Sequence, residues 1–276
     1  VAFTTDQMKA MGTSQIAALT KLQMPSFSGE QLAAIDSSDM SSLSLTAVTA
    51  ITGGQIAQLT TAQLSKLSSA QIAAIAITSI DDLTAEQVLG LTSAQIGKLT
   101  ASQIAALTAD QVKALDPAQD IAALGTAGIK AMTSVQIGAL TSAEAAQISV
   151  AQIAQISADN LSKMAVDAAS SLSTSAVKAI NATQLVRLTT DQIAGLSTQQ
   201  VAAIDTAVIK SLTSAQIKAL TTAQIDAFTT AEIIQLTVGQ IAAINTSQLP
   251  GLNTAEINAL TNAQFKALTT AQFSNL

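Results

Sequence analysis

Residues 212–219 read Leu-Thr-Ser-Ala-Gln-Ile-Lys-Ala, and residues 220–227 read Leu-Thr-Thr-Ala-Gln-Ile-Asp-Ala. The same eight-residue pattern runs through nearly the whole chain of 276 residues. We label its positions a to h, with Leu212 at a, Thr213 at b and Gln216 at e. Large apolar side chains recur at a and f, and Ala is frequent at d, g and h. This octad is the unit from which the fold must be built.

Positions b and e carry a helix-start signal. A Thr followed three residues later by Gln is a capping box, in which the Thr213 hydroxyl accepts from the backbone N–H of Gln216 and the Gln216 side chain accepts from the N–H of Thr213. Leu212 and Ile217 stand where a hydrophobic staple places its two apolar residues. Each octad therefore predicts the start of a new helix of about two turns.

A single long helix does not fit this period. Eight residues would require about 4.0 or about 2.7 residues per turn, whereas an α-helix has 3.6. The apolar stripe would wind around a straight helix and could not stay buried. The chain must turn once in each octad, which predicts an all-α solenoid of short two-turn helices. A β-solenoid is the alternative, because Thr and Ile are regular; the Ala and Gln at d, e, g and h are poor strand formers and favour helices.

One solenoid is expected over residues 1–276, with one change of phase. The a positions recur every eight residues from Phe3 to Leu115, but the next one, Leu124, follows nine residues later. The extra residue lies within residues 116–121, where Pro117 is expected at the first position of a helix after an Asp116 cap. The extra residue is either a tolerated insertion or a bend or contact point.

Two stretches depart from the consensus. Residues 1–42 are degenerate, which suggests a capping end or a subunit contact, since terminal repeats of solenoids are often atypical. Between residues 143 and 175, Ala145 and Ala169 replace the f-position Ile and Ala165 replaces the b-position cap, so a soft or kinked segment is expected there. Near the C-terminus, Phe228, Phe265 and Phe273 are expected to enlarge the core. The frequent Ala at d suggests a close approach between neighbouring turns.

Composition narrows the function. The net charge is −6 and the pI about 4.5, which argues against a nucleic-acid partner. Charged residues make up 11% of the chain, against about 25% in typical soluble domains. Cys and His are absent, which excludes disulfides and thiolate sites and removes the most usual general base and metal ligand. No apolar run approaches the roughly 20 residues of a membrane span.

The search for chemical sites leaves none, so we expect no enzyme, no cofactor and no metal site. Asp81 and Asp82 are interpreted as a solvated turn, and no calcium-binding loop is recognisable. The Ser and Thr residues are explained as caps and have no base beside them. Residues 181–183, Asn-Ala-Thr, match a glycosylation sequon. A probable solvent face is marked by the lysines at g, which are Lys130, Lys178, Lys210, Lys218 and Lys266.

The octads at residues 91–96 (Leu-Thr-Ser-Ala-Gln-Ile) and 220–225 (Leu-Thr-Thr-Ala-Gln-Ile) resemble the LTxxQIxAL octad tracts of large bacterial extracellular and cell-surface proteins. The resemblance covers the whole chain and is specific for the type of repeat. It implies a secreted, cell-envelope-associated protein, such as a filament or an adhesin stalk. The chain has no initiator Met or signal-peptide pattern at Val1, and we interpret it as a mature product or a section of a longer array.

The function expected from these observations is structural. Small, weakly charged outward positions would leave a surface poorly protected against association, so copies of the chain are the expected partners, as subunit or shaft of an extracellular bacterial filament or surface layer. A contact with the cell surface or matrix is also considered. The alternative is an adhesin or scaffold that binds a partner through one face of the solenoid.

Overall fold

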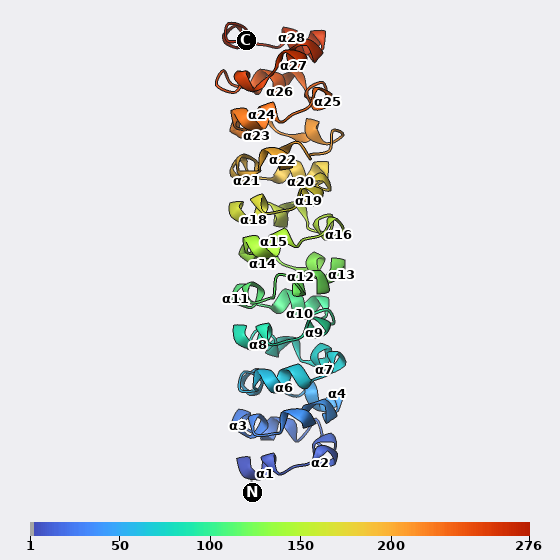
Figure 1. Cartoon of the computed structure of the whole chain (residues 1–276). Helices are drawn as coiled ribbons and strands as arrows, with labels where there is room; N and C mark the ends of the chain where they lie inside the picture. The colour runs from blue at the N-terminus through green and yellow to red at the C-terminus, as the bar shows by residue number, and fades with distance from the viewer. Residues whose placement is uncertain (1–2) are drawn as a thin grey trace. The chain divides into compact units, whose positions relative to one another are not determined.

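A computed structural model describes residues 3–276 and confirms the all-α solenoid. Short α-helices and 3₁₀-helices follow one another at the period of the octad (Figure 1). No β-strand occurs among residues 3–276, which leaves the β-solenoid without support.

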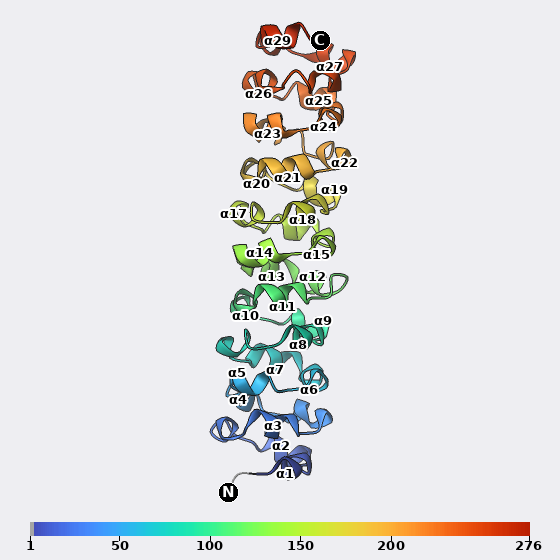
Figure 2. The same ribbon diagram turned by 90° about the vertical axis from the view of Figure 1, so that its left-hand side faces the viewer.

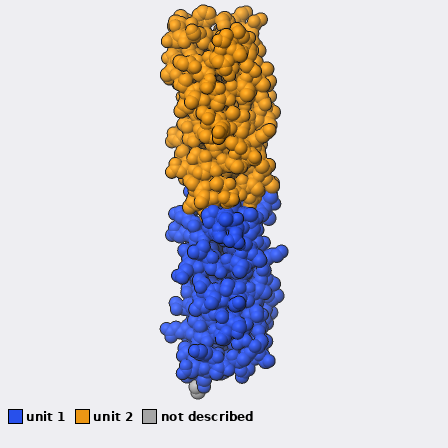
Figure 3. Space-filling model, viewed as in Figure 1, with its two compact units in different colours: residues 1–139 blue, residues 140–276 orange. Residues whose placement is uncertain are grey.

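The chain forms two compact units, residues 1–139 and residues 140–276 (Figure 3). Each unit is a coil of the same octads. The single solenoid expected over residues 1–276 stays a prediction.

In the first unit the α-helices are α1 (Thr5–Lys9), α2 (Thr13–Ala17), α3 (Gly29–Ala33), α4 (Leu45–Val48), α5 (Gly53–Ile56), α6 (Thr61–Lys66), α7 (Ser69–Ala74), α8 (Ala85–Leu89), α9 (Ser93–Ile96), α10 (Ala101–Ala106), α11 (Ala109–Lys113), α12 (Asp120–Ala123), α13 (Gly125–Ala131) and α14 (Ser134–Ala139). Its 3₁₀-helices are η1 (Met24–Ser26), η2 (Ser37–Ser42) and η3 (Ile77–Ser79).

In the second unit the α-helices are α15 (Ser142–Ala146), α16 (Val150–Ile153), α17 (Ala158–Leu161), α18 (Val166–Ser170), α19 (Thr174–Lys178), α20 (Ala182–Arg187), α21 (Thr190–Gly195), α22 (Thr198–Val201), α23 (Ser214–Ala219), α24 (Thr222–Asp226), α25 (Thr230–Ile233), α26 (Val238–Ala243), α27 (Thr254–Ala259), α28 (Asn262–Lys266) and α29 (Thr270–Phe273). Its 3₁₀-helices are η4 (Ile209–Ser211) and η5 (Leu249–Gly251).

The helix starts follow the predicted capping box. The backbone N–H of Gln216 donates to the Thr213 hydroxyl at 3.1 Å, and the N–H of Thr213 donates to Oε1 of Gln216 at 2.7 Å. Helix α23 then ends at Leu220, which is extended with φ −62° and ψ 144°, and the next cap, Thr221, is extended as well. Two extended residues, at a and b, therefore turn the chain between one helix and the next.

The core is made by positions a and f. Ile217 is fully buried and Leu212 is 4% exposed, and the same positions are buried throughout both units apart from the first and last octads. Ala215, at d, is exposed, as is Ala94. The expected close approach of neighbouring turns at d is therefore wrong, because d faces solvent.

Within each unit a helix packs on the helix three octads later in the chain. In the first unit α8 packs on α11 and α10 on α13; in the second, α17 packs on α20 and α18 on α21. Figures 1 and 2 show the short helices of each unit in successive layers as the chain winds. Neighbouring turns of the coil must therefore supply each other's core.

The extra residue at the phase change is absorbed in a helix start. The N–H of Asp116 donates to the Asp120 carboxylate at 2.9 Å, four residues away instead of three. Pro117 lies in the turn before α12, so its expected place at the first position of a helix is wrong: the inserted residue delays the helix. Burial raises the pKa of Asp120.

The degenerate first stretch is irregular, as expected. Two of its octads form the 3₁₀-helices η1 and η2 instead of α-helices. The side chain of Leu22 is 88% exposed. Replacing the consensus residues therefore weakens the helix of an octad without ending the period.

The stretch from 143 to 175 keeps the regular pattern. Ala145 and Ala169 are buried at f, and their helices, α15 and α18, pack on each other. Ala165 precedes α18 without a side-chain cap, as its sequence requires. The lower stability of this segment stays a prediction.

Candidate functional site

The amide of most e-position Gln residues has a second role beyond the capping box. Oε1 of Gln87 accepts from the N–H of Thr84 at 2.7 Å, as in any capping box. Nε2 of Gln87 donates to the carbonyl oxygens of Ile56 at 2.8 Å and Leu59 at 2.6 Å, which lie one turn of the coil earlier. One side chain thus starts its own helix and holds the preceding turn.

We call this pair of bonds from Nε2 the glutamine clamp. Its acceptors lie 31 and 28 residues before the Gln, at position f of the fourth octad back and position a of the third. Since helices pack three octads apart and the clamp acceptors lie 28 and 31 residues back, one turn of the coil takes between three and four octads. The clamp is made by Gln55, Gln63, Gln71, Gln87, Gln95, Gln103 and Gln111 in the first unit and by Gln184, Gln192, Gln216, Gln224, Gln240, Gln248, Gln264 and Gln272 in the second.

The clamp satisfies a carbonyl group that the backbone leaves open. The carbonyl of Ile56 already accepts from the N–H of Leu59, whereas the carbonyl of Leu59 accepts from no backbone N–H among residues 3–276. Its hydrogen bond comes from Gln87, whose side chain is only 4% exposed. A buried acceptor that loses its donor costs about 1–3 kcal/mol, so the turns are joined by polar bonds as well as by apolar packing.

The phase change displaces the clamp by one residue. Nε2 of Gln136 donates to Ile104 and Leu107, which lie 32 and 29 residues earlier. The acceptors are again position f of the fourth octad back and position a of the third. The inserted residue therefore leaves the pairing of octads intact.

Sequence reasoning had assigned this Gln to the cap alone. A signal was present, because a capping box is formed by Glu as well as Gln, yet Gln stands at most e positions and Glu at three. Only the amide has a donor for the carbonyl oxygens of the preceding turn.

Three e positions carry Glu, which can cap but cannot clamp when ionised. They are Glu144, Glu232 and Glu256. An Oε atom of Glu256 accepts from the N–H of Asn253 at 2.9 Å, and the residue is 3% exposed. Burial raises the pKa of Glu256, and the negative charge of Asp226 raises it further.

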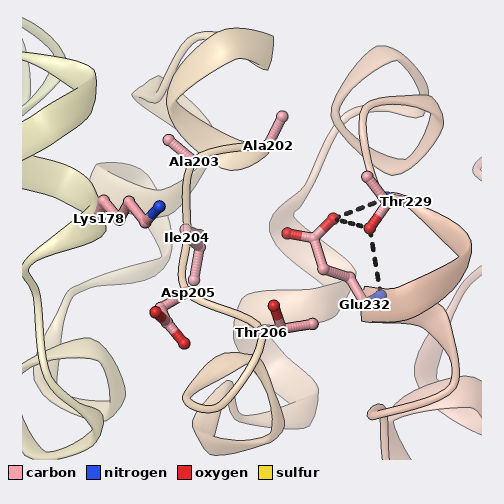
Figure 4. A pocket seen from close by; sticks show the side chains of 8 residues that line it. All are labelled: Lys178, Ala202, Ala203, Ile204, Asp205, Thr206, Thr229 and Glu232. Atoms are coloured by element: carbon pink, nitrogen blue, oxygen red, sulfur yellow. Dashed lines mark hydrogen bonds between the residues drawn. The ribbon is translucent and has the colours of Figure 1, made fainter.

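Beside the clamps, the coil carries grooves. The groove at Gln87 encloses about 350 Å³ and is lined by Leu59, Thr60 and Thr84 among others. The groove at Glu232 encloses about 370 Å³ and is lined by the equivalent residues Ile204, Asp205 and Thr229 (Figure 4). The two grooves occupy the same place in the octad. They differ in charge, because Asp205 and Glu232 take the places of Thr60 and Gln87.

The residues screened for chemistry lie apart from one another. Asp81 and Asp82 are exposed, and so are all five lysines at g. Asn181 of the sequon caps α20, with its Oδ1 accepting from the N–H of Gln184 at 3.0 Å. Among residues 3–276 no three His, Cys, Asp or Glu side chains gather as a metal-ligand group, and none of the helices there has the length and apolar character to cross a membrane.

Comparison with known proteins finds three stretches of the chain that match a repeat family. The family described as the ALTTAQ repeat matches residues 118–150, 201–238 and 241–276. These three stretches are ALTTAQ-repeat tracts. Residues 219–224 and 267–272 spell Ala-Leu-Thr-Thr-Ala-Gln letter for letter, so the final Gln of that motif is the clamp residue. No curated protein matches the chain.

We predict that Gln103→Met destabilises its turn by about 3 kcal/mol, because the variant loses the side-chain acceptor of the capping box and leaves the carbonyl of Ile75 without a donor. Gln103 is 1% exposed and clamps Ile72 and Ile75. Hydrogen exchange of residues 72–75 and urea unfolding measure the change.

The matched control is Gln7→Met. Gln7 accepts from the N–H of Thr4, and its Nε2 has no bond to an earlier turn within residues 3–276. The free energy of unfolding of this variant should fall by only about 1 kcal/mol. Equal losses in the two variants would contradict the clamp.

We also predict that acid stabilises the octad of Glu256. Its raised pKa in the folded chain means that its contribution to stability is complete below the unfolded pKa and is lost as the pH rises through the folded pKa. Glu256→Gln should therefore stabilise the chain at pH 7 and leave it unchanged or slightly weaker in acid. Thermal unfolding at a series of pH values tests this; an identical pH dependence in both proteins would count against it.

Proposed function

We propose that the chain is a structural, self-assembling protein, the subunit or shaft of an extracellular bacterial filament or surface layer. The observation that carries the proposal is that the first and last turns of the octads expose complementary halves of the glutamine clamp. The resemblance to octad tracts of bacterial surface proteins supports the proposed location.

The first turn presents donors. Gln7 and Gln15 use Oε1 on the N–H of Thr4 and Gly12, and their Nε2 atoms have no acceptor within residues 3–276. Both side chains are exposed, whereas clamp glutamines inside the units are 1–5% exposed. The first turn therefore exposes amide donors that have no carbonyl acceptor within residues 3–276.

The last turn presents acceptors and apolar surface. The last clamp, from Gln272, reaches Ile241 and Ile244, so positions f and a of the later octads are not clamped. Phe265 and Phe273 stand at f and are 42% and 56% exposed. Their expected place in the core is therefore wrong within residues 3–276, where no later octad lies against them, while Phe228 is 2% exposed as expected.

A second copy of the chain offers what the last turn lacks. Its first-turn amides can donate to the open carbonyls, and its first helices can cover Phe265 and Phe273. This contact is heterologous, because different faces meet, and heterologous contacts extend into fibres when they do not close a ring. A longer array of the same octads would expose the same two faces at its own first and last turns.

Electron microscopy and light scattering of the purified chain test the proposal. Long uniform filaments, or a mass that grows with concentration, are expected. Phe273→Asp should abolish association, because it places a charge in the contact. The control is Leu89→Asp in α8, at a side chain that is 58% exposed and belongs to neither the first nor the last turn of octads; it should associate normally. Single chains at micromolar concentration, or equal association of both variants, would refute head-to-tail assembly.

A further inference from the structure

Glu232 is a buried residue with one carboxylate oxygen that has no hydrogen-bond donor among residues 3–276. One oxygen, Oε2, accepts from the backbone N–H of Thr229 at 2.7 Å and from its hydroxyl at 2.8 Å, which is the capping role. The other, Oε1, makes no hydrogen bond among residues 3–276, although the side chain is only 3% exposed. Figure 4 shows this oxygen pointing away from Thr229, toward Ile204.

Oε1 of Glu232 occupies the position in the octad that Nε2 occupies in a clamp glutamine. In Gln224 and Gln240 the capping atom is Oε1 and the second amide atom, Nε2, meets carbonyls 31 and 28 residues back. For Glu232 those carbonyls belong to Val201 and Ile204. The carbonyl of Ile204 accepts no backbone hydrogen bond among residues 3–276. A carboxylate oxygen therefore takes the place of the clamp nitrogen, and Glu232 makes no ion pair with a basic side chain among residues 3–276.

The cavity beside Glu232 supplies room and a second carboxylate. It encloses about 370 Å³, and Asp205 and Thr206 line it together with Ile204 and Glu232 (Figure 4). One oxygen of Asp205 accepts from the N–H of Ala207 at 2.8 Å, which leaves the other oxygen available. The matched groove at Gln87 has Thr60 in place of Asp205, and its clamp is complete.

We propose that this cavity binds a calcium ion. Glu232 and the carbonyl oxygens of Val201 and Ile204 are its ligands, and Asp205 contributes from the cavity wall, directly or through water. An all-oxygen set with two carboxylates matches the hard divalent cation and its flexible geometry, whereas zinc prefers nitrogen and sulfur ligands that the site lacks. The ion would replace the missing clamp by joining the same two turns.

The affinity should be modest. The site has two carboxylates, and Lys178 lines the same cavity and opposes a cation. Calcium sites in extracellular modules bind with Kd values on the order of 10⁻⁴–10⁻³ M, and we expect this range. The inference is independent of the proposed assembly, because the site lies within one unit.

Calorimetric titration with calcium chloride, and thermal unfolding of the same protein at constant ionic strength, test the proposal. Calcium should bind and raise the unfolding temperature of the natural chain. Glu232→Gln should restore an ordinary clamp, fold normally and lose the calcium response. Asp205→Thr, which restores the residue found at Thr60, should weaken binding about tenfold, because it removes one charged ligand.

The opposite experiment introduces the proposed ligands into the groove at Gln87. Gln87→Glu combined with Thr60→Asp should create a second calcium response in the groove that has none. Magnesium and sodium chloride serve as ionic controls. An unchanged calcium response in Glu232→Gln, or none in the natural chain, would overturn the proposal. A chain that is stabilised by acid and unaffected by calcium would also overturn it, since a proton would then fill the gap between the oxygens.

Discussion

The buried side-chain amide at position e is the interaction on which each unit depends. An isolated helix of one or two turns is unstable in water, and an octad has too little apolar surface to hold itself together. The amide removes two deficits at once: it accepts from the N–H at the start of its own helix and donates to the a-position carbonyl of the preceding turn, which has no backbone donor. It adds a second donor to the f-position carbonyl. Its burial makes these bonds strong and makes their loss costly. The clamp therefore couples the local start of a helix to the stacking of the coil.

Apolar packing and the clamp act at neighbouring positions of one helix. The f side chain, next to the amide, fills the centre of the coil, and the a side chain closes the turn between helices. Because a and b are both extended, the carbonyl at a points away from any helix and would stay open without the later Gln. Position d is exposed to solvent. Ala is favoured there because it has a high helix propensity, and its side chain has no role in packing. This division explains why the octad needs two large residues and one amide, and little else.

The capping box at Thr213 and Gln216 and the arithmetic of the eight-residue period were enough to predict short helices and a turn in every octad. The number of octads in a turn of the coil could not be predicted. The acceptors of the clamp are backbone carbonyls, which leave no mark on the sequence, and nearly identical octads give no signal at 28 or 31 residues. Phe265 and Phe273 were assigned to the core because their pattern matches Ile217, but burial at f also needs a later turn above it. The calcium site at Glu232 escaped notice because its ligands include carbonyls brought together only by coiling.

The constant offset of the clamp has a consequence for the gene. Since each amide pairs with backbone atoms at fixed positions of the third and fourth octads back, one octad can replace another in the stack. Recombination that duplicates or removes a block of eight codons leaves every remaining amide with an equivalent pair of carbonyls. The inserted residue before α12 shows that even an unequal block is accepted when it falls in a helix start, where Gln136 recovers the same partners. The length of such a tract can therefore change in inheritance without a new solution to the folding problem.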